Sequence, residues 1–302
     1  DQIRQLINDL NIEGLDLVAT SRRVYPYGSL ASHILGFVGA ENTGLYGLES
    51  RYDQYLQGQS GLVVSAKDVK GNPLPYEYEQ YFAAQSGQDV VLTLDANVQY
   101  YLEKYVGEMA DKYGAENGAT GIVMDVKTGG ILGMVSYPTY DLNNAFTVQN
   151  DQFKKDLTDT SDQLLKQWRN KALNDTYEPG STFKPCTAIA ALTSDKVDLD
   201  TSTEIKCEGV FTKYAADGYA PECWIWAQGY THPKENVTTA LRDSCNYFFY
   251  ECGSRLGETR LYQYAAAFGL TSKTGIDLPG ESKSIFWSRD SFNIVNLATA
   301  SF

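Results

Sequence analysis

Tyr177-Glu-Pro-Gly-Ser-Thr-Phe-Lys-Pro185 is the stretch around which this chain is organised, because it places Ser181 and Lys184 three residues apart. The Pro-Gly pair at 179–180 interrupts the preceding segment, and the apolar residues of 188–192 continue as a helix. Residues three apart on a helix share a face, so the hydroxyl and the amine can meet. A desolvated lysine amine can take the proton of a serine hydroxyl. The stretch therefore predicts a serine acyl-enzyme.

The Ser-x-x-Lys pattern alone is weak, since it also occurs by chance on the solvated faces of helices. Two further features favour catalysis. Lys184 lies on an otherwise apolar helix, where its side chain is expected to be partly buried, and a second polar element, Ser244-Cys245-Asn246, follows later in the chain. Both features raise the weight of the catalytic interpretation over that of a solvated helix face.

The composition excludes some classes of protein. The chain has 302 residues, of which 43% are hydrophobic and 21% charged, an ordinary globular composition that is long enough for two domains. Its formal net charge of −13 argues against a nucleic-acid partner, because such a partner needs a basic surface. No apolar run reaches the length of a membrane span. The chain starts in an amphipathic pattern and stops in an apolar one, so both ends are expected to be truncations.

A domain boundary is predicted near Gly87, where a polar, tyrosine-rich connection ends and a new strand begins. Beyond it, an apolar stripe from Val98 to Met109 predicts a long helix. Two apolar runs at 121–126 and 131–136, joined by a short glycine-containing turn, predict a β-hairpin. The predicted domains are residues 1–87 and residues 88–302.

Together these motifs resemble those of the class B penicillin-binding proteins. The resemblance in the second domain is carried by Tyr177–Lys184, Ser244–Asn246, Tyr137–Asn143 and Thr274–Glu281. In the first domain, Arg23–Pro26, Leu30–His33 and Gly47–Leu56 are similar to the non-catalytic pedestal of that family. The resemblance implies an α+β or α/β multidomain fold: a serine β-lactamase/transpeptidase-like domain, with helices on an antiparallel sheet that is incomplete here, after a mixed α/β pedestal of the dimerisation type.

The resemblance also implies a role for each of four side chains. Ser181 attacks the penultimate D-alanine carbonyl of a cell-wall stem peptide and expels the last D-alanine, and its backbone N–H forms half of the oxyanion hole. Lys184 acts as the general base, which requires a neutral amine. Ser244 relays the proton to the leaving amine, and Asn246 holds Lys184 and the substrate amide. A second stem-peptide amine then resolves the acyl-enzyme and cross-links the wall, and β-lactams acylate the same serine.

One feature departs from the family pattern. The third family motif, Lys-Thr-Gly on an edge strand, fits neither triplet of this chain: Lys127-Thr-Gly129 lies in a hairpin turn and Lys273-Thr-Gly275 in a loop without a strand pattern. The catalytic triplet is therefore expected beyond Phe302. A catalytic domain that stops before this motif would lack one wall of its cleft and is expected to be inactive.

Cys207, Cys223, His232 and Cys245 form a candidate structural zinc site. Three thiolates and an imidazole suit tetrahedral zinc, and clustered cysteines are unlike a dispersed, even set of disulfides. The spacing is irregular, and the alternative is that these are small buried apolar side chains. In an extended loop Cys245 points away from its two neighbours, so a metal there would fix the loop from behind. Some elongation-type members of the family carry zinc near this motif, and no organic cofactor is expected.

Location and partners follow from the same resemblance. It implies the extracytoplasmic face of the cell membrane, with an N-terminal anchor that this sequence does not include. The implied ligands are peptidoglycan stem peptides and β-lactams, and the implied protein partner is a membrane-embedded glycosyltransferase or another divisome-type or elongasome-type protein. Whether the process is elongation, division or sporulation stays open, and no nucleic acid is expected.

Two other functions are weighed against the transpeptidase. One is a D,D-carboxypeptidase or β-lactamase-type hydrolase, which uses the same serine and lysine with water as the acceptor. The pedestal-like first 87 residues argue against both hydrolases, which rarely carry such a module. The other is a non-catalytic wall-assembly scaffold or β-lactam sensor, which would keep the fold without turnover.

Overall fold

The computed structural model describes residues 2–10, 21–64, 80–195, 197–287 and 294–302. The chain divides into two compact units, residues 1–174 with 277–280 and residues 175–276 with 281–302. The predicted boundary near Gly87 falls inside the first unit and stays a prediction. Both units combine helices with short antiparallel strands, so the expectation of mixed helix and sheet is confirmed.

The first unit begins with short helices and one small sheet. Its elements are α1 (Gln2–Asp9), α2 (Ser32–Leu35), α3 (Gly47–Arg51), α4 (Asp53–Leu56), β1 (Leu62–Val64) and β2 (Gln80–Phe82), and the two strands pair antiparallel. Helices α2 and α3 meet at two glycines with positive φ, Gly36 and Gly47. A Cβ on Gly36 would lie 1.8 Å from the carbonyl oxygen of Tyr46, so only glycine permits this close approach.

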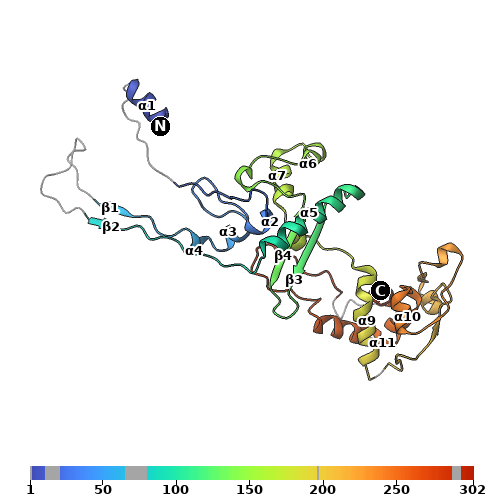
Figure 1. Cartoon of the computed structure of the whole chain (residues 1–302). Helices are drawn as coiled ribbons and strands as arrows, with labels where there is room; N and C mark the ends of the chain where they lie inside the picture. Colours follow the sequence, from blue (N-terminus) through green and yellow to red (C-terminus); the bar gives the residue numbers. More distant parts are fainter. Residues whose placement is uncertain (1, 11–20, 65–79, 196, 288–293) are drawn as a thin grey trace. The chain divides into compact units, whose positions relative to one another are not determined.

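A helix and a β-hairpin form the centre of the first unit. Helix α5 (Ala96–Tyr113) packs against strands β3 (Ala119–Met124) and β4 (Ile131–Tyr137), as Figure 1 shows. The carboxylate of Asp95 caps the helix by accepting from two backbone N–H groups of its first turn. Gln99, which is buried, exchanges two hydrogen bonds of 2.8 Å with the backbone of Met134 and so ties the helix to β4. Both the predicted helix and the predicted hairpin are confirmed.

The rest of the first unit is short helices over an aromatic core. Its elements are η1 (Leu142–Asn144), α6 (Asp151–Asp156), α7 (Thr160–Trp168) and α8 (Lys171–Asn174). His33 is buried here, with its Nε2 3.0 Å from the carbonyl oxygen of Gln167 and its ring edge-on to Tyr140. Burial lowers the pKa of His33 to about 4, so the ring is neutral and acts as a core residue.

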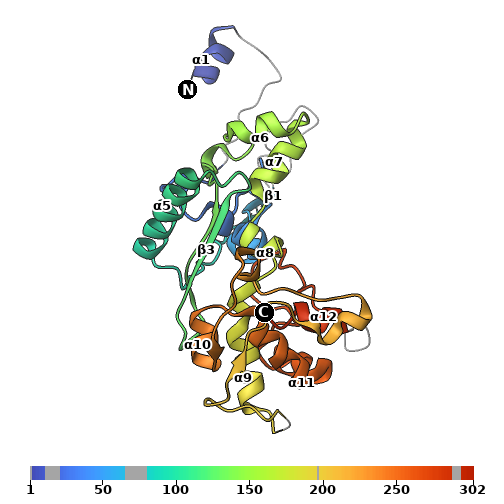
Figure 2. The ribbon, with the colours of Figure 1, turned by 90° about the vertical axis from the view of Figure 1, so that its right-hand side faces the viewer.

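The second unit is built on two long helices. Its elements are η2 (Gly180–Phe183), α9 (Lys184–Thr193), β5 (Ile205–Lys206), η3 (Thr212–Asp217), η4 (Trp226–Gln228), β6 (Lys234–Glu235), α10 (Val237–Arg242), α11 (Asn246–Ala267) and α12 (Ile294–Thr299). Helix α9 packs against α11 (Figure 2). Helix α11 is interrupted at Gly257, whose φ of 72° is not helical. Among the described residues, no helix combines the length and apolarity that crossing a bilayer requires.

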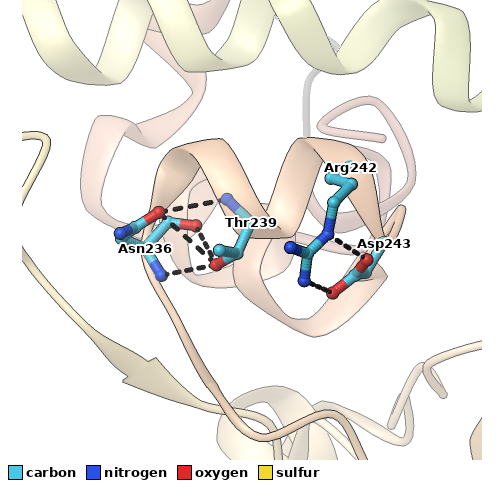
Figure 3. Close-up of polar contacts among 4 residues, drawn as sticks. All are labelled: Asn236, Thr239, Arg242 and Asp243. Carbon is cyan, nitrogen blue, oxygen red and sulfur yellow. Dashed lines mark hydrogen bonds and ion pairs between the residues drawn. The ribbon is translucent and has the colours of Figure 1, made fainter.

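Helix α10 is closed at both ends by polar contacts, which Figure 3 shows. At its start, Asn236 accepts from the backbone N–H of Thr239, and the Thr239 hydroxyl accepts from the backbone N–H of Asn236. At its end, the guanidinium of Arg242 donates two hydrogen bonds of 2.7 Å to the carboxylate of Asp243. The capping box thus fixes where the helix begins, and the helix ends at Arg242, with Asp243 as the C-cap residue directly before Ser244.

Candidate active site

Ser181 and Lys184 lie where the 3-10 turn η2 passes into α9. Gly180, with φ +56°, turns the chain into this junction. In a 3-10 turn, side chains three residues apart are eclipsed, which brings the two side chains together. Pro185 follows in the first turn of α9, where its missing N–H leaves no intrahelical bond unmade. The Nζ of Lys184 lies 3.1 Å from the Oγ of Ser181.

The loop between α10 and α11 completes this arrangement. The Nζ of Lys184 lies 2.9 Å from the Oγ of Ser244 and 2.6 Å from the Oδ1 of Asn246. The Ser244 hydroxyl donates to the Oγ of Ser181 at 2.9 Å. The structure thus brings together all four side chains that the sequence predicts, and we call Ser181, Lys184, Ser244 and Asn246 the Ser–Lys group.

Lys184 is only 1% exposed, which is unusual for a lysine. This burial lowers the pKa of Lys184 to about 8, although the Cys223 and Cys245 thiols and the Glu235 carboxylate oppose the shift. About one amine in ten is then neutral at pH 7. The ring of Phe249, 5.5 Å from Nζ, stabilises the remaining ammonium form. The lysine can therefore both accept a proton and return it.

Ser244 has a left-handed backbone, with φ +53°, a conformation that is uncommon for residues other than glycine. The next N–H, that of Cys245, donates to the carbonyl oxygen of Ala240 at 2.9 Å. The carbonyl of Ser244 accepts from Lys184 Nζ at 2.9 Å and from the indole Nε1 of Trp224 at 3.1 Å. Trp224 was not singled out from the sequence, where its one signal is its place directly after Cys223.

The four predicted metal ligands also converge, and we call Cys207, Cys223, His232 and Cys245 the Cys–His cluster. All four are buried, and their ligand atoms lie within 4.8 Å of one another. The Sγ of Cys223 is 3.4 Å from the Nδ1 of His232. Ligands of tetrahedral zinc, bound at about 2.0–2.3 Å, lie roughly 3.3–3.8 Å apart. The cluster could therefore bind a metal after only a small contraction.

Local structure explains how distant residues reach this cluster. Strands β5 and β6 pair Ile205 with Glu235, which places Cys207 beside the segment that carries His232. Cys245 is the N-cap residue of α11, directly between two members of the Ser–Lys group.

A buried carboxylate adjoins the cluster and supports the fit of a cation. Glu235 is 1% exposed, and neither of its carboxylate oxygens has a hydrogen-bond partner within the described part of the chain. Burial raises the pKa of Glu235, and its interactions with Cys245 and His232 oppose that shift. A buried carboxylate without partners is costly, and a nearby metal ion reduces that cost. The donor set and this carboxylate both fit a divalent cation.

The Lys-Thr-Gly triplet at 127–129 lies in the hairpin turn and the one at 273–275 in a loop, as predicted. The Asp125 carboxylate accepts from the backbone N–H of Lys127 and from the hydroxyl of Thr128, each at 2.9 Å. The Glu281 carboxylate accepts from the backbone N–H of Thr274 at 2.6 Å and from its hydroxyl at 2.7 Å. In each triplet the threonine is held by a carboxylate as part of a turn, and neither triplet belongs to a strand.

Two family descriptions match the chain: "Penicillin binding protein transpeptidase domain" over residues 119–302 and "Penicillin-binding Protein dimerisation domain" over residues 1–92. Stage V sporulation protein D of Bacillus subtilis is 36% identical over 296 residues, which cover 98% of this chain and 42% of that protein. Peptidoglycan D,D-transpeptidase MrdA of Escherichia coli is 28% identical over 300 residues, which cover 92% and 44% respectively. The chain therefore spans less than half the length of these relatives.

Solved structures agree with this match. The chain is similar to crystalline penicillin-binding protein 3 from Mycobacterium tuberculosis complexed with ampicillin, with 26% identity and a TM-score of 0.71. The likeness covers 93% of this chain and 54% of that one. The predicted fold class, a transpeptidase-type domain with a pedestal, is confirmed.

Proposed function

This chain belongs to the class B penicillin-binding proteins, and we propose that it carries the nucleophile and base of a peptidoglycan D,D-transpeptidase. One observation carries the proposal: the buried amine of Lys184 lies 3.1 Å from the hydroxyl of Ser181. A lysine held in this way can act as a general base, since burial favours its neutral form. The match of residues 119–302 to a penicillin-binding protein transpeptidase domain supports the same function.

The Ser–Lys group allows each proton of the reaction to be followed. Neutral Lys184 takes the proton of Ser181 while Oγ attacks the penultimate D-alanine carbonyl of a stem peptide, and the carbonyl oxygen becomes an oxyanion. When the amide C–N bond breaks, the ammonium of Lys184 returns a proton through the Ser244 hydroxyl to the leaving D-alanine amine. An amine of a second stem peptide then attacks the ester and gives a proton to Lys184. When the ester C–O bond breaks, Lys184 passes that proton to Ser181 Oγ, which restores the serine hydroxyl and the neutral amine.

Asn246 and Ser244 hold the base in place during these steps. The side-chain oxygen of Asn246 accepts from Lys184 Nζ at 2.6 Å, which directs the amine toward Ser181. The backbone N–H of Ser181 is proposed as one oxyanion donor. A β-lactam carbonyl would meet the same nucleophile, so β-lactams are proposed as acylating inhibitors.

Zinc is the proposed metal of the Cys–His cluster, because three thiolates and one imidazole are its usual tetrahedral set. The bound ion would supply a fixed crosslink between segments of the chain and no chemistry on the substrate. Cys207, Cys223, His232 and Cys245 would hold it. Since Cys245 lies between Ser244 and Asn246, this crosslink would fix the loop that carries both residues.

The remaining proposals concern the whole protein. We propose a pedestal domain at 1–87 and a transpeptidase domain at 88–302, which the match of residues 1–92 to a dimerisation domain supports. The proposed location is the extracytoplasmic face of the cell membrane. The proposed partners are stem peptides and a membrane-embedded glycosyltransferase or a related wall-synthesis protein.

Transfer and hydrolysis are separated by one experiment on the full-length protein. It is incubated with a peptide that ends in D-Ala-D-Ala and with a labelled D-amino acid as the acceptor, and the products are followed by mass spectrometry. A transpeptidase exchanges the last D-alanine for the label, and Ser181→Ala abolishes the exchange. Release of D-alanine without incorporation of the label would favour the hydrolase. A protein that is acylated by β-lactams but neither exchanges nor releases D-alanine would favour the sensor.

A further inference from the structure

We propose that Trp224 is a positioning residue of this active site, which holds Ser244 through a hydrogen bond from its indole N–H to the Ser244 carbonyl. The distance between Trp224 Nε1 and the carbonyl oxygen is 3.1 Å. The proposal rests on the proposed function, because the position of Ser244 matters only if Ser181 reacts. Trp224 comes from the cysteine- and aromatic-rich segment 203–233, which we call the insert, and its proposed role is to support the Ser–Lys group.

Ser244 needs such support because its backbone is strained. With φ +53° in a residue that has a side chain, the left-handed conformation persists only where neighbouring contacts impose it. The Ser244 hydroxyl lies 2.9 Å from both Ser181 Oγ and Lys184 Nζ, so a small rotation of this backbone would break both contacts. The hydrogen bonds on the Ser244 carbonyl are therefore connected directly to the reacting atoms.

Lys184 cannot supply this support throughout the reaction. As an ammonium it has three N–H donors, but in the neutral form that takes the proton of Ser181 it has only two. Its Nζ lies within 3.1 Å of four acceptor oxygens, those of Ser181, Asn246 and both oxygens of Ser244. The indole N–H of Trp224 does not titrate. It therefore holds the Ser244 carbonyl whichever form Lys184 takes.

Trp224 is itself fixed by the neighbouring cluster. It follows Cys223 in the chain, and its ring lies edge-on to His232 with 5.7 Å between the ring centroids. The side chain is 48% exposed, so the N–H edge makes the specific contact while much of the ring faces solvent. Trp224→Phe should therefore remove the donor and leave the ring contact with His232 in place.

The test is the acylation of the full-length protein by benzylpenicillin, resolved into a non-covalent dissociation constant and a first-order acylation rate constant. In Trp224→Phe the rate constant should fall about fivefold to tenfold, as expected for one lost hydrogen bond. The dissociation constant and the bound zinc should not change. The matched control is Trp226→Phe, a tryptophan of the same insert whose ring lies over Gly209. It should acylate at the wild-type rate.

Each outcome decides between the two proposals. If the acylation rate constant of Trp224→Phe lies within twofold of that of the wild type, the role of Trp224 is overturned. The proposed function is kept in that case, because the wild-type protein is still acylated. A wild-type protein that is not acylated would instead overturn the proposed function.

Hydrogen exchange of the indole N–H tests the contact without relying on the Trp224 variant. The chain has four tryptophans, and single substitutions of the other three assign the Trp224 signal in a ¹⁵N-tryptophan-labelled sample. The N–H of Trp224 should exchange at least about tenfold more slowly than that of Trp226. Equal exchange rates would overturn the proposal.

Discussion

The Ser–Lys group and the Cys–His cluster share one tripeptide, Ser244-Cys245-Asn246. The outer two residues contact Lys184, and the middle one belongs to the cluster. One group combines hydroxyls with an amine whose pKa is lowered by burial, which suits proton transfer. The other group gathers three thiols and an imidazole, which suits a metal. Three consecutive residues therefore contribute to two groups with different chemistry.

Removing the base should give the largest effect. Lys184→Ala should slow acylation of Ser181 by benzylpenicillin about 10²-fold to 10⁴-fold, the usual contribution of a general base. Lys184→Arg is the sharper variant, because guanidinium keeps the charge but does not lose its proton. Both variants should be measured by stopped-flow acylation, and a near-normal rate for Lys184→Arg would show that charge, and not proton transfer, is required.

The next largest effect on acylation is expected from a change in the Cys–His cluster. Cys245→Ser should lose bound zinc in native mass spectra and should slow acylation about tenfold to a hundredfold, because the loop that carries Ser244 is no longer fixed. Cys252→Ala is the matched control, since this buried cysteine lies on α11 outside the cluster. It should keep both zinc and rate. If a zinc-free Cys245→Ser protein were acylated at the normal rate, the Cys–His cluster would not be needed to position the Ser–Lys group.

The pH dependence sharpens the description of the Ser–Lys group. Burial lowers the pKa of Lys184 from its ordinary value near 10.5 to about 8, so the reactive neutral amine accumulates as the pH rises. The acylation rate should increase about tenfold per pH unit below this value and level off above it. The neighbouring thiols of Cys223 and Cys245 and the carboxylate of Glu235 raise the pKa, so loss of Glu235 should shift the profile to lower pH. A profile that is flat from pH 6 to 9 would contradict a lysine base.

Of the two histidines of the chain, His33 should give the smallest effect on acylation, because His232 belongs to the Cys–His cluster. His33 is buried against Tyr140 and Gln167 in the first unit and is not a member of the Cys–His cluster. His33→Ala should lower the free energy of unfolding by about 2–3 kcal/mol through a cavity and a lost hydrogen bond. Its zinc content and acylation rate should stay at wild-type values, whereas His232→Ala should lose zinc. Loss of zinc in His33→Ala would contradict the assignment of His232, and not His33, as the histidine that binds the metal.

Much of this site could be predicted from the sequence because its residues lie in short, patterned stretches. The spacing of Ser181 and Lys184 on a helix start determines their contact. The expected extended loop around Cys245 is not what the structure has, since Ser244 is left-handed and Asn246 already belongs to α11. The glycine-containing turn and two apolar runs were sufficient for the β3–β4 hairpin. Where the prediction is confirmed, the decisive contact is local in sequence.

Contacts between distant segments could not be predicted in the same way. The hydrogen bond from Trp224 to Ser244 joins residues 20 positions apart and depends on the tertiary fold, which no local pattern encodes. Glu235 was not singled out from the sequence, and its burial accompanies the pairing of β5 with β6. Such tertiary contacts are not visible in periodicity or spacing.

The most direct test is the intact mass of the full-length protein after incubation with excess benzylpenicillin, compared with that of Ser181→Ala. The geometry of the Ser–Lys group predicts one covalent adduct on the wild-type protein, located by peptide mapping at Ser181, and none on the variant. An adduct at another residue, an adduct that persists in Ser181→Ala, or a wild-type protein that stays unmodified would contradict the assignment of Ser181 as the nucleophile.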